Sequence, residues 1–417
     1  MDRAWSPTIY RLGFLFAAFL FVSHLFFFLE AVGTPPWKDN DFAHFFLTAR
    51  LTLDGANPYI TPLGPLYPEY GFSPQRIIIA SATNPPGLIS LTLFLPNLDP
   101  LTGYLIWSGL QFLSAIGAMI LILRMYPVTS RPAEVVILIA VTAVSHPMFQ
   151  LIRFGQVQGL LLLLMVAGLA LFKTDARGPA GMAGAFLWGL AAGIKIFPMP
   201  LLYVAARYGG IRAVTLFAFG ALAPQIPFLW IAGGQAFLDF FSGALPYIQK
   251  SAILYLGNVS IPPSVTYTCV IFSVDPHLLL KVYRYASLVS AIAFAAVILR
   301  DWRGAGDVDR SFSIVLLGIL LFSPTAWTNY LIFAFPPIAC LAHLSRQSPP
   351  WRPGLTAALL SYMIVGSSPG WLTVGHPAVQ FTTIWTAAAG VLIAAVAIGI
   401  RSSRADRAPG PLSSRRL

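Results

Sequence analysis

The sequence has little charge for its size: charged residues make up 10% of its 417 positions, whereas soluble domains carry about 25%. Hydrophobic residues make up 57%, more than a soluble chain could cover with so few charges. Several apolar runs, such as 12–29 and 278–299, reach the roughly 17–25 residues that cross a bilayer. The composition therefore excludes a soluble globular protein and predicts an all-α polytopic membrane protein.

Cysteine and the common catalytic motifs are also scarce. Cys269 and Cys340 lie far apart in apolar segments, so neither a disulfide framework nor a zinc site is expected. The chain lacks a Gly-Lys-Ser phosphate loop, an H-E-x-x-H zinc motif, a G-x-S-x-G nucleophile motif and a soluble D-x-D domain for nucleotide sugars. ATP, nucleotide sugars and cofactors are therefore not expected, and any group donor is predicted to be lipid-linked.

The basic residues predict the topology. The net charge of +11 comes from Lys and Arg dispersed along the chain, which argues against nucleic acid as a partner. Most of them fall in alternate connections, which the positive-inside rule places in the cytoplasm. This alternation predicts about twelve transmembrane helices with both ends inside. The predicted spans are 12–29, 101–124, 133–150, 157–172, 180–194, 196–208, 212–232, 278–299, 311–324, 330–345, 353–367 and 380–400.

Two further apolar stretches, 85–95 and 261–274, are predicted to lie in the interface or to re-enter partway, because crossing would put arginine-rich connections outside. If both crossed, the count would be fourteen. We expect one transmembrane domain over 1–401 and a disordered cytoplasmic tail over 402–417.

Two external loops, 30–100 and 233–277, are long, and long loops in compact domains are usually functional. In the first, the spacing of apolar residues over 41–53 predicts a short amphipathic interfacial helix. Because the cytoplasmic connections are shorter, the chemistry is expected on the outer face.

The first external loop also holds two closely spaced carboxylates, Asp39 and Asp41. A carboxylate at the membrane boundary could act as a general base, taking the proton of an acceptor hydroxyl as that hydroxyl attacks. The alternative is structural, since Asp41 is well placed to cap a helix that begins after it. Asp41 is the predicted catalytic residue, and Asp39 is a nearby substrate-binding candidate.

Lys195 lies between two apolar segments, where a charge is costly and is by default functional. Its ammonium could hold a phosphate, or the side chain could simply extend to the interface. The short turn 145–158 gathers His146, Arg153 and Gln156. Arg153 could bind phosphate through two parallel hydrogen bonds, Gln156 could bind sugar hydroxyls, and His146 is either a ligand-binding or a structural histidine.

Five further residues complete the predicted substrate-binding set. Trp327 could stack on a sugar ring or belong to the interfacial aromatic belt, and Asn329 follows it closely. Asn258 belongs to a sequence that also matches a glycosylation sequon. Lys281 and Arg284, near the outer start of the span 278–299, could grip anionic head groups.

An ordered series of short motifs resembles glycosyltransferase family 87, the polyprenyl-phosphate-mannose-dependent mannosyltransferases of the GT-C superfamily. The motifs are Asp41-Phe42, Asp54-Gly55-Ala56-Asn57-Pro58-Tyr59, Asn84-Pro85-Pro86, Phe154-Gly155-Gln156-Val157-Gln158, the segment Gly189–Pro198 and Ser323-Pro324-Thr325-Ala326-Trp327. The resemblance runs over about 37–345 and implies a GT-C fold with interfacial helices in the first external loop.

The resemblance further implies an inverting transfer with Asp41 as the base. It maps the Lys-x-x-Pro segment of the family onto Lys195 and Pro198. Gln158 stands where the family often has Asn, a departure that concerns fine specificity. Other GT-C enzymes bind a metal through an acidic residue of the second loop. This chain has none between Glu134 and Asp175, so no metal is expected.

Together these features predict a glycosyltransferase of the inner (plasma) membrane with its site facing the periplasm or exterior. The donor would be a polyprenyl-phosphate sugar, expected to be mannose, and the acceptor a lipid-linked or cell-envelope glycan. A flippase or transporter without glycosyl transfer is the alternative, but it would be expected to carry charges deep in several spans or an internal repeat. A ligase that joins polymers to lipid A would share the outer-face site without the ordered motifs.

Overall fold

The computed structural model describes residues 41–73, 81–129, 132–247, 258–272, 275–304, 306–323, 326–347, 352–366 and 388–398, with Val22 and Leu25. These residues are mostly helical and include no β-strand beyond an isolated bridge. Three helical stretches are long and apolar enough to cross a membrane, and a bent pair makes a fourth candidate. The prediction of an all-α membrane protein is confirmed, while the count of twelve helices stays a prediction.

Four helices form the centre of the bundle: α5 (Pro100–Met125), α8 (Gln158–Thr174), α9 (Pro179–Ile194) and α11 (Gly210–Leu222). Helices α8 and α9 run antiparallel, whereas α5 runs parallel to α8 and α11 runs parallel to α9. Helix α9 packs between α8 and α11 through small residues. A Cβ added to Gly184 would lie 2.5 Å from the carbonyl oxygen of Gly168, and one on Gly189 would lie 1.9 Å from that of Phe217. This close approach of backbones is typical of helices that pack within a membrane.

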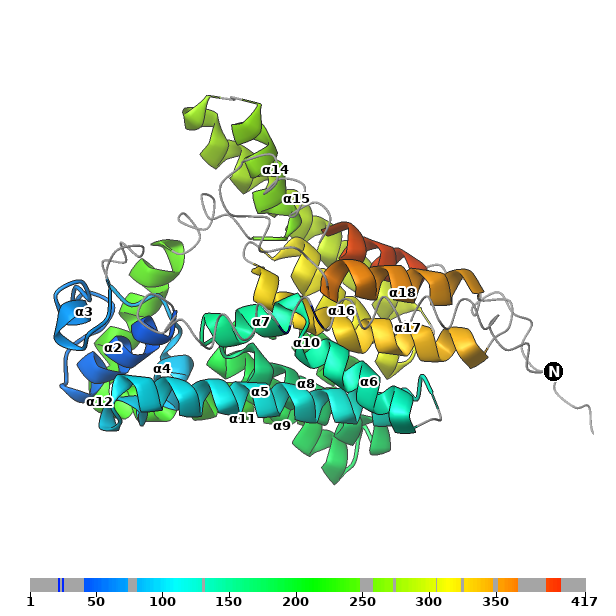
Figure 1. The fold of residues 1–417 in the computed structure, drawn as a ribbon, viewed down its shortest axis with the longest axis horizontal. Coiled ribbons are helices and arrows are strands. Elements are labelled where there is room, and N and C mark those ends of the chain that lie inside the picture. The colour runs from blue at the N-terminus through cyan, green and yellow to red at the C-terminus, as the bar shows by residue number, and fades with distance from the viewer. Residues whose placement is uncertain are drawn as a thin grey trace, which may run out of the picture.

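The remaining helices flank this bundle (Figure 1). Helices α14 (Ile261–Ile271) and α15 (Pro276–Arg303) lie side by side and lead into α16 (Val308–Phe322). A 3₁₀ segment, η6 (Thr328–Ala334), then continues into α17 (Phe335–Gln347), which packs on α18 (Arg352–Gly366). A last described helix spans Ala388–Ile398.

At one end of the molecule, short elements of the first long loop gather, as the left side of Figure 1 shows. They are α2 (Asp41–Leu53), α3 (Leu66–Glu69), α4 (Pro86–Thr92) and η2 (Leu95–Asn97), which lie near α12 (Ile226–Asp239). Helix α2 has the predicted bounds, but it is not an amphipathic surface helix. Its polar residues His44, Thr48 and Thr52 are buried together with its apolar ones.

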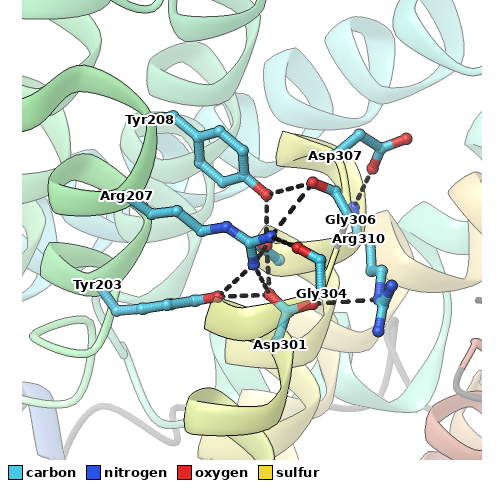
Figure 2. Close-up of polar contacts among 9 residues, drawn as sticks. Tyr203, Arg207, Tyr208, Asp301, Gly304, Gly306, Asp307 and Arg310 are labelled. Atoms are coloured by element: carbon cyan, nitrogen blue, oxygen red, sulfur yellow. Dashed lines mark hydrogen bonds and ion pairs between the residues drawn. The ribbon is translucent and has the colours of Figure 1, made fainter.

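The helix ends on the opposite side are joined by two polar networks. In the first, Asp309 of α16 accepts a hydrogen bond from the Tyr126 hydroxyl (2.6 Å) and pairs with Lys173 (2.6 Å). The second is centred on the buried Asp301, which pairs with Arg207 at 2.7 Å and with Arg310 at 3.1 Å (Figure 2). Segments that the distribution of basic residues predicts to be cytoplasmic therefore meet at one end of the molecule.

Most predicted spans correspond to helices, with two differences. The span 133–150 is not one helix: α6 (Pro132–Ala143) and α7 (His146–Arg153) meet at a bend of 49°. Pro147 lies at the first turn of α7, where its missing N–H and its ring prevent a continuous helix. The predicted span is therefore a bent pair of helices, and whether it crosses the membrane stays a prediction.

The second difference is the span 196–208, which is helical only from Leu201, as α10 (Leu201–Val204) and a π-helical turn, η3 (Ala205–Gly209). Pro198 and Pro200 disfavour helix before that point. The segment still returns to the end where α9 begins, since Arg177 Nε lies 3.5 Å from the Tyr208 carbonyl.

The two stretches predicted not to cross the membrane, 85–95 and 261–274, contain helices of seven and eleven residues. These helices are too short to cross a bilayer. The span 12–29 lies almost wholly outside the described residues, and the tail 402–417 lies entirely outside them.

Candidate functional site

Asp41 lies at the N-terminus of α2 and faces the turn between α7 and α8. Its Oδ2 accepts a hydrogen bond from the side-chain amide of Gln156. The position at a helix start also favours a negative charge, because the unpaired N–H groups of the first turn carry partial positive charge. Within the described part of the chain, Oδ1 has no hydrogen-bond partner, so this oxygen is available to a substrate.

Gln156 joins Asp41 to Lys195. Its amide oxygen accepts from Lys195 Nζ at 3.3 Å and from Gln158 Nε2 at 3.2 Å. Because a lysine can only donate, the oxygen of the amide must face Lys195, and the NH₂ group must then face Asp41. The three side chains come from α2, the α7–α8 turn and the end of α9, and a single amide orients them.

Lys195 follows the last residue of α9 and has an extended backbone, so the helix ends there and the side chain is not part of a helical face. Its ammonium donates to the Tyr330 hydroxyl at 3.3 Å and lies 5.5 Å from the centre of the same ring. The ring therefore adds a cation–π contact. Two of the three N–H bonds of the ammonium have partners among the described residues, which leaves one for an anionic ligand.

The turn that carries Gln156 is held against α2 by a glycine. Gly155 has a φ of +61°, a left-handed conformation, and an added Cβ would lie 2.7 Å from the Cβ of Phe42. Its carbonyl accepts the indole N–H of Trp107 at 2.6 Å, and the Tyr104 hydroxyl donates to the carbonyl of Ile152 at 3.0 Å. Helix α5 thus anchors the turn from the other side.

Burial raises the pKa of Asp41 above its ordinary value of 3.8. The charge of Lys195 and the hydrogen bond from Gln156 act in the opposite direction, but burial is the larger effect. The carboxylate is therefore more basic than a solvated aspartate, while the neighbouring lysine limits the rise in its pKa. This combination suits a group that must take a proton near neutral pH.

Two further predicted residues of the 145–158 turn, His146 and Arg153, have different surroundings from Gln156. His146 is buried at the start of α7, where its Nε2 lies 3.3 Å from Gln150 Nε2. Arg153 is exposed, and its guanidinium lies 5.8 Å from the ring centres of Phe149 and Phe154. The turn therefore points Gln156 towards Asp41 and Arg153 towards the surface.

The candidates later in the chain are placed in different ways. Asn258 is buried, and its side-chain oxygen accepts the backbone N–H of Ala326 at 2.9 Å, while its backbone forms an isolated bridge with Trp327. This contact holds the second long loop against the segment before Tyr330. Asn329 is also buried, next to Tyr330.

Two candidates are not brought to Asp41, and a third is not described. Lys281 and Arg284 are exposed on α15, and within the described residues no hydrogen bond links them to the site. Asp39 lies outside the described residues. Tyr330 was not predicted. The sequence feature that could have identified Tyr330 is its position shortly after the motif that contains Trp327. An aromatic residue at that position is equally expected in the interfacial belt.

These features define a helical membrane protein with a partly buried carboxylate and a lysine at one end, joined by an amide. The profile of glycosyltransferase family 87 matches residues 82–324, more than half of the sequence. The chain therefore belongs to glycosyltransferase family 87, and membership indicates glycosyl transfer as its activity. The matched range contains Gln156 and Lys195 but not Asp41. No match was found among curated proteins.

Proposed function

We propose that the protein is an inverting glycosyltransferase that moves mannose from a polyprenyl-phosphate donor to a lipid-linked or cell-envelope acceptor. The reaction would take place on the extracytoplasmic face of the inner membrane. The observation that carries the proposal is the Gln156 amide, which holds a carboxylate of raised pKa beside a lysine that keeps one N–H without a partner among the described residues. These are the two groups that a direct displacement from a sugar phosphate needs.

In this mechanism Asp41 acts on the acceptor. Its free oxygen accepts the hydrogen bond of the attacking hydroxyl and takes the proton as the new bond to the anomeric carbon forms. Gln156 holds the other oxygen and so fixes the carboxylate plane. Attack opposite to the leaving group inverts the anomeric configuration.

Lys195 acts on the donor. As the bond between the anomeric carbon and the phosphate oxygen breaks, the electron pair leaves with the polyprenyl phosphate, and the ammonium stabilises that charge. Arg153, Lys281 and Arg284 are exposed cations that could guide the anionic donor, and Trp327 could stack on a sugar ring. Asp39, His146, Asn258 and Asn329 remain proposed substrate-binding residues.

The test is transfer of radiolabel by the purified protein from polyprenyl-phosphate mannose, polyprenyl-phosphate glucose or GDP-mannose. We expect product only from the lipid-linked mannose, with inverted configuration by NMR, and none from Asp41→Asn. Asp54→Asn is the matched control, because Asp54 lies just after the same helix, pairs with Arg50 and is half exposed. Full transfer by Asp41→Asn would exclude Asp41 as the base, and transfer from GDP-mannose alone would exclude the proposed donor.

The same assay separates glycosyl transfer from lipid transport. A flippase would move labelled lipid across proteoliposome membranes without forming a new glycosidic product. Its cations would be expected along a path through the membrane, whereas Lys195 lies at the end of a helix and contacts Gln156 and Tyr330.

A further inference from the structure

Helix α4 lies between the two halves of the site. It packs on α2, which carries Asp41, and on α9, which ends just before Lys195. The residues Asn84 to Gly87 lead into its first turn, and each end of this short stretch contacts a different one of those two helices.

The first contact is between Asn84 and His44, which follows Asp41 by three residues on α2. Asn84 Nδ2 lies 2.8 Å from His44 Nδ1, and since an amide nitrogen only donates, Nδ1 is the acceptor. The ring proton is therefore on Nε2, which faces the Ser81 carbonyl at 3.5 Å. Burial lowers the pKa of His44 to about 4, so the ring stays neutral at physiological pH. The Tyr59 hydroxyl holds the carbonyl of Asn84 at 2.8 Å.

The second contact is between Gly87 and Gly193, which precedes Lys195 by two residues. A Cβ on Gly87 would lie 2.2 Å from the Gly193 carbonyl oxygen and 2.8 Å from Gln225 Nε2. Gln225 donates to that same carbonyl at 2.8 Å. The two backbones are thus too close to admit a Cβ, and the carbonyl that α4 touches is fixed from a second side.

We infer that His44, Asn84 and Gly87 are positioning residues: through the start of α4 they set the spacing between Asp41 and Lys195. The inference rests on the proposed function, in which both groups act on one substrate pair. A Gln side chain has a fixed length, so Gln156 can contact Asp41 and Lys195 together only within a narrow range of spacings. Misplacement by about 1 Å can cost an enzyme roughly 100-fold in rate.

The first test is Gly87→Ala. To reach an ordinary contact of 3.4 Å from 2.2 Å, the added methyl must move α4 away from Gly193 by about 1.2 Å. We expect kcat to fall by about 100-fold with KM for the donor changed by less than about threefold. Gly64→Ala, in the same loop and with no atom within 4 Å of the added Cβ, should match the wild type.

A second control separates spacing from loss of stability. Gly184→Ala creates a similar collision, 2.5 Å from the Gly168 carbonyl, but Gly184 lies roughly 16 Å along α9 from Lys195. We expect Gly184→Ala to lower the melting temperature at least as much as Gly87→Ala while keeping the wild-type kcat per folded molecule. If both variants lost kcat equally, or if Gly87→Ala kept it, the inference would be wrong.

The histidine provides a test by conservative rescue. His44→Leu removes the acceptor and leaves the partly buried Asn84 amide without it, so we expect kcat to fall at least tenfold. His44→Gln can still accept from Asn84 and donate to Ser81, and it should restore most of that loss. The acidic limb of the pH–rate profile should stay in place in His44→Gln, because the base is Asp41. A displaced limb would make His44 a proton-transfer group and overturn the positioning role.

A distance measurement keeps the inference testable without transfer activity. Spin labels at Leu53 and Ile196, both partly exposed, report the spacing of α2 and the Lys195 segment after Cys269→Ser and Cys340→Ala remove the native thiols. Gly87→Ala should shift or broaden the distance distribution on the order of 1 Å, and Gly64→Ala should leave it unchanged. Identical distributions would refute the spacer role. If Gly87→Ala changes the distance but the wild-type protein transfers sugar from no polyprenyl-phosphate donor, the proposed function is refuted and the spacer role is not.

Discussion

Gly155 offers the sharpest test of how the base is held. A methyl group at this position would lie 2.7 Å from the Cβ of Phe42, against an ordinary contact of at least 3.4 Å. The two backbones must therefore separate by about 0.7 Å. Gly155 precedes Gln156 and Phe42 follows Asp41, so the collision acts directly across the hydrogen bond that orients the carboxylate.

Two costs combine in Gly155→Ala. A left-handed φ of +61° costs a residue with a Cβ roughly 1–2 kcal/mol. Overpacking against Phe42 adds about 1–3 kcal/mol. We therefore expect the free energy of unfolding to fall by about 2–5 kcal/mol and kcat per folded molecule to fall by about 10- to 100-fold, because the base moves relative to Gln156.

Gly71→Ala is the matched control. Gly71 has a φ of +71° and lies in the first long loop, but nothing lies within 4 Å of an added Cβ. It should show the backbone cost alone, with an unchanged rate. The assays are thermal unfolding in detergent and transfer from the lipid-linked donor at saturating concentration. If Gly155→Ala behaved like Gly71→Ala in both, the turn would not be what holds the base.

The other predictions concern charge. Because burial raises the pKa of Asp41, the folded state favours the protonated acid; this contribution to stability is present below pH 3.8 and is lost as pH rises through the folded pKa. Asp41→Asn should therefore be more thermostable than the wild type at pH 7, with a gap that closes at low pH. For the same reason kcat/KM should fall on acidification at a pH above the ordinary aspartate range, and in Lys195→Met, which removes a charge that lowers this pKa, the residual activity should fall at a still higher pH. Tyr330→Phe removes an acceptor of the Lys195 ammonium, and since a hydrogen bond to a charged group contributes roughly 1.5–3 kcal/mol, transfer should fall about tenfold or more with no change in the pH profile. Asp301→Asn should cost about 3–5 kcal/mol of stability, because Arg207 and Arg310 lose their buried partner, while the rate per folded molecule stays unchanged.

Local sequence signals predicted the parts of the structure that depend on neighbouring residues. The spacing of apolar residues predicted the bounds of the helix 41–53, and the apolar runs predicted the long helices 100–125 and 276–303. The burial of the first of these helices was not predictable in the same way. His44 is polar in sequence but buried in the fold, because Asn84, forty residues away, supplies its hydrogen bond.

The arrangement of the site depends on contacts between distant residues. Gln156 lies 115 positions from Asp41, and Tyr330 lies 135 positions from Lys195. The types of residue could be proposed from sequence, since a carboxylate and a lysine at the membrane boundary are rare. Gln156 was proposed as a ligand for sugar hydroxyls, but its position between Asp41 and Lys195 could not be predicted, because a glutamine in a short turn has no periodicity or charge that indicates its partners.

That separation explains how one site can hold both a base and a cation. A direct pair between Asp41 and Lys195 would occupy the carboxylate oxygen and the ammonium that the two substrates need, and it would hold the pKa of Asp41 low. With Gln156 between them, the lysine still limits the rise in the pKa of the base. Each group also keeps one hydrogen-bonding position without a partner among the described residues. Gln156→Glu would replace the donor to Asp41 with a second carboxylate, which would compete for Lys195 and repel the base. The length and neutrality of this side chain are therefore as important to the proposed reaction as the two charges it joins.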